Sequence, residues 1–389
     1  MTPRSSTAAR REPIAPGLLR RMTVRRVLDT LRATGPTTRA DLARATGISA
    51  PTISKAIASL LDLGVVEETD PAASATAGRP ARRLRLATRS ARVVGVVLDA
   101  ERIEVGAAGL DGRQITGTRT SAATPASYEA LIRTTADLVA PHLDADAELL
   151  GIGLSSPGLT DRREQRVILS PNLPVTNGRR PAADLAAALG VPASLCQEAH
   201  ALCLAERLVG AARDLDDFAV LDATAGLGTG IYHAGQLVQG ARGLAGEFGH
   251  VTFEPDGLPC GCGNRGCLET LATDRALAAR VSEELGETLG ADEALEAISV
   301  DPARHARAID ATEQWLSIAI AGVVNVFDPA AVFVHVRWPH RVDGAFDRLV
   351  ARARARLVNP EKDVCVIEPS RVSKLDGAVA VVLHSTILR

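Results

Sequence analysis

The sequence has no long apolar run and few cysteines. The chain of 389 residues contains six cysteines and only 3% aromatic residues. No segment of about 18 apolar residues is present, which argues against a membrane-spanning helix. The N-terminal stretch "MTPRSSTAARREPIAPG" lacks the apolar region of a secretory signal, and the cysteines are too few for a disulfide scaffold. We therefore expect a cytoplasmic protein with no membrane partner, built from two or three domains.

The net charge of −2 conceals a strong asymmetry along the chain. Residues 1–92 carry 17 Lys and Arg against 7 Asp and Glu, a net of +10, whereas the remainder carries 27 against 39, a net of −12. A basic front end on an acidic body favours contact between the front end and a polyanion. A solvated arginine-rich tail is the alternative, and we expect residues 1–17 to be a disordered basic arm.

Three short helices are expected in the basic part. Residues 24–35 and 49–64 space their apolar residues on one helical face, and residues 37–47 begin with a threonine cap and end at Gly47. The third segment has Ser49 as a good N-cap and Pro51 in its first turn, where proline is tolerated. A glycine turn between the second and third helices is typical of a helix-turn-helix. Two strands around an arginine-containing loop follow, so residues 18–90 are predicted to form a winged helix-turn-helix domain.

This domain is interpreted as DNA-binding, with a small protein-interaction module as the alternative. The third helix would enter the major groove, and the arginine loop would reach the minor groove or the phosphate backbone. The residues expected to contact double-stranded operator DNA are Ser49, Thr52, Ser54 and Lys55 on the helix and Arg79, Arg82 and Arg83 in the wing.

Residues 91–389 have the pattern of an α/β body with two lobes. Buried strands are expected within 92–113, 149–160, 217–240 and 330–336. Helices are expected between them, at 127–140, 181–189, 199–212, 274–285 and 305–326. Strands interleaved with helices indicate an α/β architecture.

Specific motifs in the body resemble the ROK family of sugar kinases and repressors. They are "GLSSPGL" (153–159), "SPNLP" (170–174) and "GLGTGIYHAGQLVQGARGLAGEFGHVTFEPDGLPCGCGNRGCLE" (226–269). The preceding winged helix matches the family's transcriptional regulators, which include xylose and N-acetylglucosamine repressors. The resemblance implies an actin-like, hexokinase-like fold with a sugar cleft between the lobes and an oligomerisation surface.

The histidine and cysteines of this run form a candidate zinc site. His250, Cys260, Cys262 and Cys267 offer one nitrogen and three sulfurs, a set suited to tetrahedral Zn²⁺. All four ligands come from the protein, so the ion, one per chain, is expected to be structural. Buried cysteines without a metal are the alternative. The other three cysteines are interpreted as ordinary buried thiols.

The resemblance also implies sugar-binding residues. Glu247, His250, Glu269 and Asn172 match family positions that contact sugar hydroxyls. In "CQEAHALCLAE" (196–206), Gln197, Glu198 and His200 replace the Asn-Asp-x-Asn of the kinases, where the aspartate is the catalytic base. The expected sugar-binding set is Asn172, Gln197, Glu198, Glu247, His250 and Glu269.

Three departures from the family's kinases affect ATP binding or phosphoryl transfer. Glutamate at 198 moves the carboxylate by one methylene. In the first phosphate turn, Asp99 and Glu101 stand where a glycine and a threonine are usual, and we expect them to present negative charge to ATP phosphates. The strand "VFVHVRW" (332–338) lacks the glycine pair that normally accommodates the nucleotide. The chain is therefore expected to have no catalytic residues and not to be an enzyme.

The leading hypothesis is a sugar-responsive transcriptional regulator of carbohydrate metabolism genes, in the manner of a repressor. It would bind operator DNA as a homodimer or homotetramer, and a sugar or sugar derivative in the cleft would change that binding. The alternative is an ATP-dependent sugar kinase with an appended DNA-binding domain. Regulation by a protein partner in place of a sugar is a third possibility.

Overall fold

The computed structural model describes residues 16–69, 82–143, 147–359, 361 and 365–386. By their contacts, these residues divide into two compact units, and the division follows Ser90. No helix in the described ranges combines the length and apolarity needed to cross a membrane.

The first unit is a winged helix-turn-helix, as predicted. The Thr38 side chain accepts a hydrogen bond from the Asp41 amide at 3.2 Å and so caps the second helix, which ends at left-handed Gly47. Ile53 and Ile57 of the third helix are fully buried, so its apolar face forms the core of the unit. The described elements are α1 (Pro16–Thr34), α2 (Arg39–Thr46), α3 (Ala50–Asp62) and the antiparallel strands β1 (Val66–Thr69) and β2 (Arg83–Leu86).

The first helix begins earlier than the sequence pattern suggested. It starts at Pro16 instead of near residue 24, so the last two residues of the predicted disordered arm belong to α1. No helix breaker stands between Gly17 and Gly35, and leucine and arginine are strong helix formers, which explains the extension. Residues 1–15 of the predicted arm lie outside the described residues.

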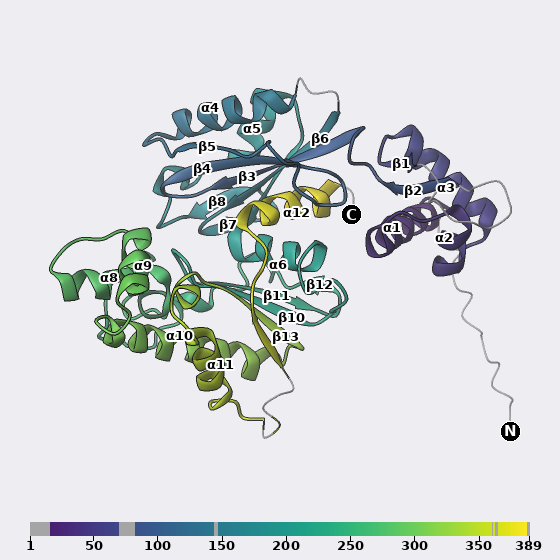
Figure 1. Cartoon of the computed structure of the whole chain (residues 1–389). Coiled ribbons are helices and arrows are strands. Elements are labelled where there is room, and N and C mark those ends of the chain that lie inside the picture. The colour runs from purple at the N-terminus through teal and green to yellow at the C-terminus, as the bar shows by residue number, and fades with distance from the viewer. Residues whose placement is uncertain (1–15, 70–81, 144–146, 360, 362–364, 387–389) are drawn as a thin grey trace, which may run out of the picture. The chain divides into compact units, whose positions relative to one another are not determined.

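The second unit contains two sheets of the same topology, one for each lobe (Figure 1). In each sheet an antiparallel hairpin continues into two further strands that run parallel to the first. The first sheet has the order β5 (Thr120–Ala123), β4 (Arg102–Ala108), β3 (Ala91–Leu98), β6 (Glu148–Ser156) and β9 (Ala193–Gln197). The second has the order β12 (Gln236–Leu237), β11 (Gly228–His233), β10 (Phe218–Asp222), β13 (Ala331–His335) and β14 (Val366–Pro369). The short strands β7 (Leu159–Asp161) and β8 (Arg166–Leu169) form a separate hairpin.

Helices cover both sheets and also lie between them. Helices α6 (Glu198–Leu208) and α12 (Lys374–Thr386) pack against each other between the sheets, and α4 (Tyr128–Val139) and α5 (Pro181–Leu189) cover the opposite face of the first sheet (Figure 1). All five helices predicted in the body are present. The remaining helices belong to the second lobe and are α7 (Glu269–Ala272), α8 (Asp274–Leu285), α9 (Ala291–Val300), α10 (Ala306–Phe327) and α11 (Ala345–Arg354). The sequence pattern did not predict α7, α9, α11 and α12.

Helix α12 approaches the first sheet so closely that only glycine fits between them. A Cβ atom at Gly153 of β6 would lie 2.0 Å from the carbonyl oxygen of Ala378. Glycine permits this direct contact between a helix backbone and a strand backbone. The packing fixes the first residue of α12, Lys374, beside Asp99, the residue that follows β3.

Candidate metal centre, ligand pocket and nucleic-acid surface

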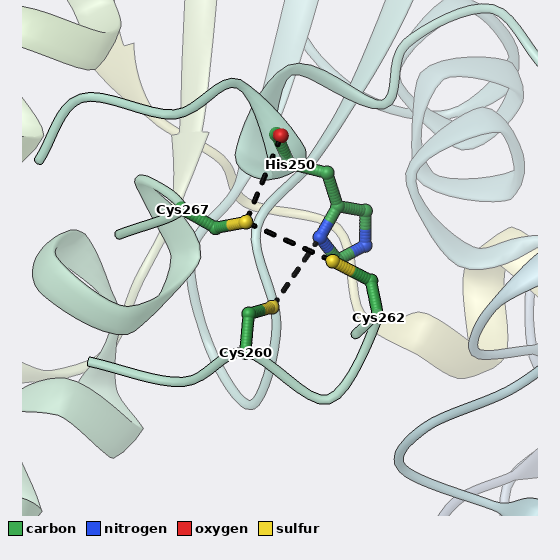
Figure 2. Close-up of side chains that lie close together, drawn as sticks. All are labelled: His250, Cys260, Cys262 and Cys267. Carbon is green, nitrogen blue, oxygen red and sulfur yellow. Dashed lines mark hydrogen bonds between the residues drawn. The ribbon is translucent and has the colours of Figure 1, made fainter. Parts of the chain in front are cut away.

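The predicted metal ligands converge on one point (Figure 2). One ligand atom from each of His250, Cys260, Cys262 and Cys267 lies within 4.8 Å of the other three. His250 Nδ1 lies 3.6 Å from the sulfur of Cys260, and the sulfurs of Cys262 and Cys267 are 3.7 Å apart. Tetrahedral zinc with Zn–S bonds of about 2.3 Å holds its sulfurs about 3.8 Å apart. The side chains therefore fit a zinc ion with the ligand set expected from the sequence.

Tight glycine turns hold the cysteine loop in this form. Gly263 and Gly266 have φ angles of 97° and 62°, in the left-handed region that favours glycine. A Cβ atom at Gly266 would lie 1.5 Å from the carbonyl oxygen of Glu254. The loop closes on itself because the Cys260 amide donates to the Asn264 carbonyl at 2.8 Å. This turn therefore brings the sulfurs of Cys260 and Cys262 close together through local sequence alone.

The three remaining cysteines lie apart from this centre. Within the described part of the chain, no second group of His, Cys, Asp or Glu side chains is arranged to hold a metal. Burial raises the pKa of Cys196 to about 12 and that of Cys365 to about 11, and it also raises the pKa of Cys203. Cys203 and Cys365 are buried as predicted, whereas Cys196 is partly exposed, and the raised pKa values keep all three thiols neutral at pH 7.

Glu247 lies beside the metal centre on the other edge of the histidine ring. Its carboxylate is 3.7 Å from His250 Nε2, while Nδ1 of the same ring faces the sulfurs. A carboxylate on the outer nitrogen is the usual partner of a metal-bound histidine, since it fixes the tautomer and the ring orientation. Burial, together with the negative charge of Glu269, raises the pKa of Glu247 to about 7.

Glu269 and Asn172 meet at the glycine-rich turn after β10. The amide of Leu227 donates to Glu269 Oε2 at 3.1 Å. A Cβ atom at Gly226 would lie 2.9 Å from this oxygen and 3.3 Å from the amide nitrogen of Asn172. Asn172 also accepts a hydrogen bond from Arg275 at 2.7 Å. The structure therefore gathers Glu247, Glu269 and Asn172 around the turn and the metal loop, although they are distant in sequence.

The residues at the kinase base motif have distinct roles in the structure. Gln197 caps helix α6, because its side-chain oxygen accepts the His200 amide at 3.1 Å. The buried His200 ring bonds the Ala245 carbonyl at 2.9 Å and so supports the loop that leads to Glu247. Of the three, Glu198 alone takes part in an ion pair with a partner distant in sequence.

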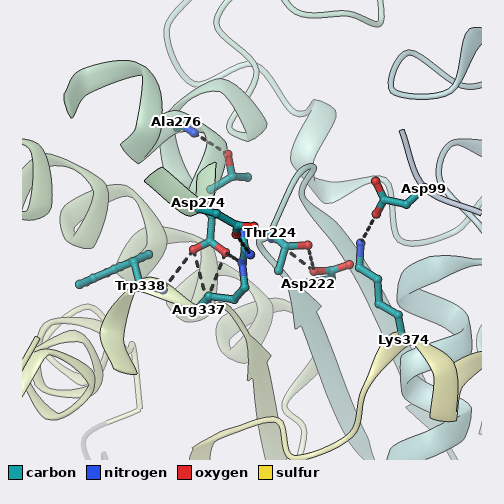
Figure 3. A network of polar contacts seen from close by, with 10 residues as sticks. Asp99, Asp222, Thr224, Asp274, Ala276, Arg337, Trp338 and Lys374 are labelled. Carbon is teal, nitrogen blue, oxygen red and sulfur yellow. Dashed lines mark hydrogen bonds and ion pairs between the residues drawn. The ribbon is translucent and has the colours of Figure 1, made fainter. Parts of the chain in front are cut away.

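That partner is Lys374, a residue that the sequence analysis did not identify. Its ammonium lies 2.9 Å from Glu198 and 3.2 Å from Asp99, and Figure 3 shows the contact with Asp99. Burial raises the pKa of Glu198 to about 7, Lys374 opposes the shift, and Asp222 and Asp99 add to it. Asp99, which is expected to present negative charge to ATP phosphates, is thus paired with Lys374 in the structure. Glu101 is solvent-exposed.

A second network occupies the end of β13, where the expected glycine pair is missing (Figure 3). The buried carboxylate of Asp274 accepts the Arg337 side chain at 3.0 Å and the Trp338 amide at 3.2 Å. Arg337 also binds Asp292 at 2.5 Å. Burial raises the pKa of Asp274, and Arg337 opposes this shift. The Trp338 side chain is fully buried, so a bulky residue and an ion pair follow β13, and no glycine pair is present there.

The first unit presents a polar helix surface of the predicted composition. Ser49, Thr52, Ser54 and Lys55 are all exposed, while Ile53 between them is buried. The hydroxyls of Ser49 and Thr52 lie 2.9 Å apart. Short polar side chains and a lysine at the N-terminal end of a helix can reach base edges and phosphates.

The arginines of the wing are partly engaged within the unit. Arg82 donates to Glu68 at 2.6 Å, and its side chain is still 72% exposed. Arg83 donates to the Pro36 carbonyl. Both cations therefore lie at the base of the wing, on β2 or beside it, instead of projecting from a free loop. Arg79 lies outside the described residues.

Known proteins match both units of the chain. Residues 93–381 match the ROK family and residues 18–75 match the MarR family. A glucokinase of Thermotoga maritima is 30% identical over 261 residues, which cover 62% of this chain and 81% of the kinase. The xylose repressor of Bacillus subtilis is 26% identical over 306 residues, covering 77% of this chain and 78% of the repressor.

A solved structure matches nearly the whole chain. It is described as a ROK family transcriptional regulator, a homologue of the Escherichia coli MLC protein. Its TM-score is 0.78 at 22% identity, with 95% of this chain and 97% of that chain covered. The predicted combination of a winged helix-turn-helix with an actin-like, hexokinase-like body is thereby confirmed. The chain belongs to the ROK family and carries a MarR-type winged helix-turn-helix in front of the family's body.

Proposed function

We propose that this protein is a DNA-binding transcriptional repressor that responds to a sugar and has no kinase activity. The observation that supports it most strongly is the exposed polar face of α3 in a winged helix-turn-helix joined to a ROK body. The xylose repressor of Bacillus subtilis is similar to this chain over 77% of its length. We further propose that it binds operator DNA as a homodimer or homotetramer, since a symmetric oligomer presents two recognition helices to two half-sites.

The sugar would bind beside the metal loop. Glu247, Glu269 and Asn172 present acceptors and donors around the turn at Gly226, and carboxylates give directional bonds to hydroxyls. Zinc held by the His–Cys cluster would fix the loop that positions Glu247, so its part in this proposal is structural. Sugar binding regulates DNA binding only if the affinity for the sugar differs between the DNA-bound and the free protein.

Glu247→Ala is expected to remove the sugar's effect on operator binding while sugar-free DNA binding stays intact. Loss of one hydrogen bond to a charged acceptor costs about 1.5–3 kcal/mol, which weakens sugar binding roughly 10- to 150-fold. Calorimetry measures the sugar affinity, and a gel-shift titration on the same preparation measures operator binding with and without the sugar. The matched control is Asp256→Ala, an exposed carboxylate on the same loop. An unchanged sugar response in the Glu247 variant would refute the pocket.

A second candidate function is an ATP-dependent sugar kinase, which the match to the glucokinase favours. Two features of the site argue against it. Lys374 pairs with the carboxylate at the position of the base, and Arg337 and Trp338 follow β13, where no glycine pair is present. Phosphoryl transfer depends on positioning and on groups that stabilise phosphate charge, and we expect both features to oppose it.

The chain is therefore expected not to phosphorylate glucose, xylose or N-acetylglucosamine at the expense of ATP. Glu198→Asp, which restores the kinase-type base, should also be inactive because Asp99 and Trp338 remain. A coupled assay of ADP release, with an active sugar kinase as the positive control, measures this. Sugar-dependent ADP release by the natural chain would favour the kinase function instead.

A further inference from the structure

The charge distribution around Lys374 bears on the chemical class of the effector, and this argument depends on the function proposed above. Three carboxylates surround the lysine, each from a different element. Asp99 follows β3, Glu198 begins α6, and Asp222 ends β10. Figure 3 shows Asp222 between Thr224 and Lys374, and it is close enough to contribute to the electrostatics of both Glu198 and Lys374.

The ammonium of Lys374 is fully committed to this cluster. It makes ion pairs with Glu198 at 2.9 Å and with Asp99 at 3.2 Å, and its side chain is only 17% exposed. The neighbouring cation, Arg337, is engaged by Asp274 and Asp292. One lysine thus faces three carboxylates, and the cluster has an excess of negative charge in a largely buried place.

Glu198 places this cluster at one end of the proposed sugar pocket. Glu198 stands at the position of the family's catalytic base, which faces the hydroxyl that a kinase would phosphorylate. An uncharged hydroxyl there can donate to a Glu198 oxygen. A phosphate ester on the same hydroxyl would enter the cluster as an anion, next to carboxylates and away from bulk water, where like charges repel strongly.

We propose that the effector is an uncharged sugar and that the Asp99–Glu198–Asp222–Lys374 cluster excludes the phosphate ester of that sugar. The cluster acts as a charge filter. It accepts a hydroxyl through Glu198, and its excess negative charge rejects an anion. Asp99 is then a specificity-determining residue that does not itself contact the sugar.

Calorimetry on the full chain tests this with matched ligand pairs. The probes are glucose, N-acetylglucosamine and N-acetylmannosamine with their 6-phosphates, and xylose with its 5-phosphate. For the sugar that binds, the ester is expected to bind at least about 100-fold more weakly, since opposed like charges cost several kcal/mol. The measured quantity is the ratio of the ester's dissociation constant to that of the free sugar. Asp99→Asn should reduce this ratio by about tenfold or more and leave the affinity for the free sugar nearly unchanged.

Control variants distinguish an effect of the cluster from a general effect of net charge and from misfolding. Glu101→Gln removes one negative charge two residues away, on an exposed side chain, and should leave the ratio unchanged. Glu198→Gln removes a charge within the cluster and should also lower the ratio, so the test does not depend on Asp99→Asn folding. Thermal unfolding of each variant confirms that the body is intact.

Each other outcome has a definite meaning. An ester that binds more tightly than its sugar would show that Lys374 leaves its carboxylates for phosphate, which overturns the charge filter but not the sugar-responsive function. An unchanged ratio in both Asp99→Asn and Glu198→Gln also overturns the filter. If no sugar and no ester binds the natural chain, the proposed sugar response fails and the filter fails with it.

Discussion

Removal of residues 1–90 is expected to abolish specific operator binding and to leave the body folded. The exposed face of α3 and the basic residues lie in the first unit, whereas both sheets and their cores lie within 91–386. A gel shift with a duplex selected from a random library by the full chain measures DNA binding, and calorimetric unfolding measures the integrity of the body. Full affinity of the truncated chain for the selected duplex would contradict the assignment.

Point variants and salt dependence extend this test to the full chain. Lys55→Glu places an acidic side chain on the exposed face of α3 and should weaken binding strongly without unfolding, because position 55 is exposed. For the natural chain, the logarithm of the binding constant should fall with the logarithm of salt concentration, by about 0.9 for each phosphate neutralised. Arg304→Glu, which makes the same change of charge at an exposed site in the body, is the matched control and should bind DNA normally.

Cys262→Ser is expected to lose a bound zinc ion that the natural chain holds at about one per molecule. A serine oxygen replaces one sulfur of a closed tetrahedral set, and metal loss is among the mechanisms that destabilise proteins by about 2 kcal/mol or more. The loop that carries Glu247 should loosen, so the sugar response is expected to fail as well. Elemental analysis and thermal unfolding measure the two effects.

A buried cysteine outside the cluster provides the control for this loss. Cys365→Ser should lower stability through burial of a hydroxyl but should keep its zinc, because Cys365 lies apart from the His–Cys centre. Freshly purified natural chain without zinc, or full zinc occupancy in Cys262→Ser, would contradict the proposed site.

Features that depend on nearby residues were predictable from the sequence. The cap at the start of α2 and the left-handed end at Gly47 follow from local hydrogen bonds and glycine geometry. The four candidate metal ligands span residues 250–267, so their spacing and chemistry predicted that they would cluster. The start of α1 was placed too late, since the arginine-rich stretch that precedes residue 24 has no apolar periodicity but remains a good helix former.

The arrangement of charges around Lys374 was decided by the tertiary structure. Lys374 pairs with Asp99 across 275 positions of sequence, and this depends on the contact of α12 with β3 and β6 through glycine. No local pattern distinguishes a buried lysine at a helix start from a solvated one. An ion pair forms where the fold brings opposite charges together away from water. The sequence by itself therefore determined the domains and the candidate metal ligands, while the packing of α12 determined which carboxylates meet Lys374.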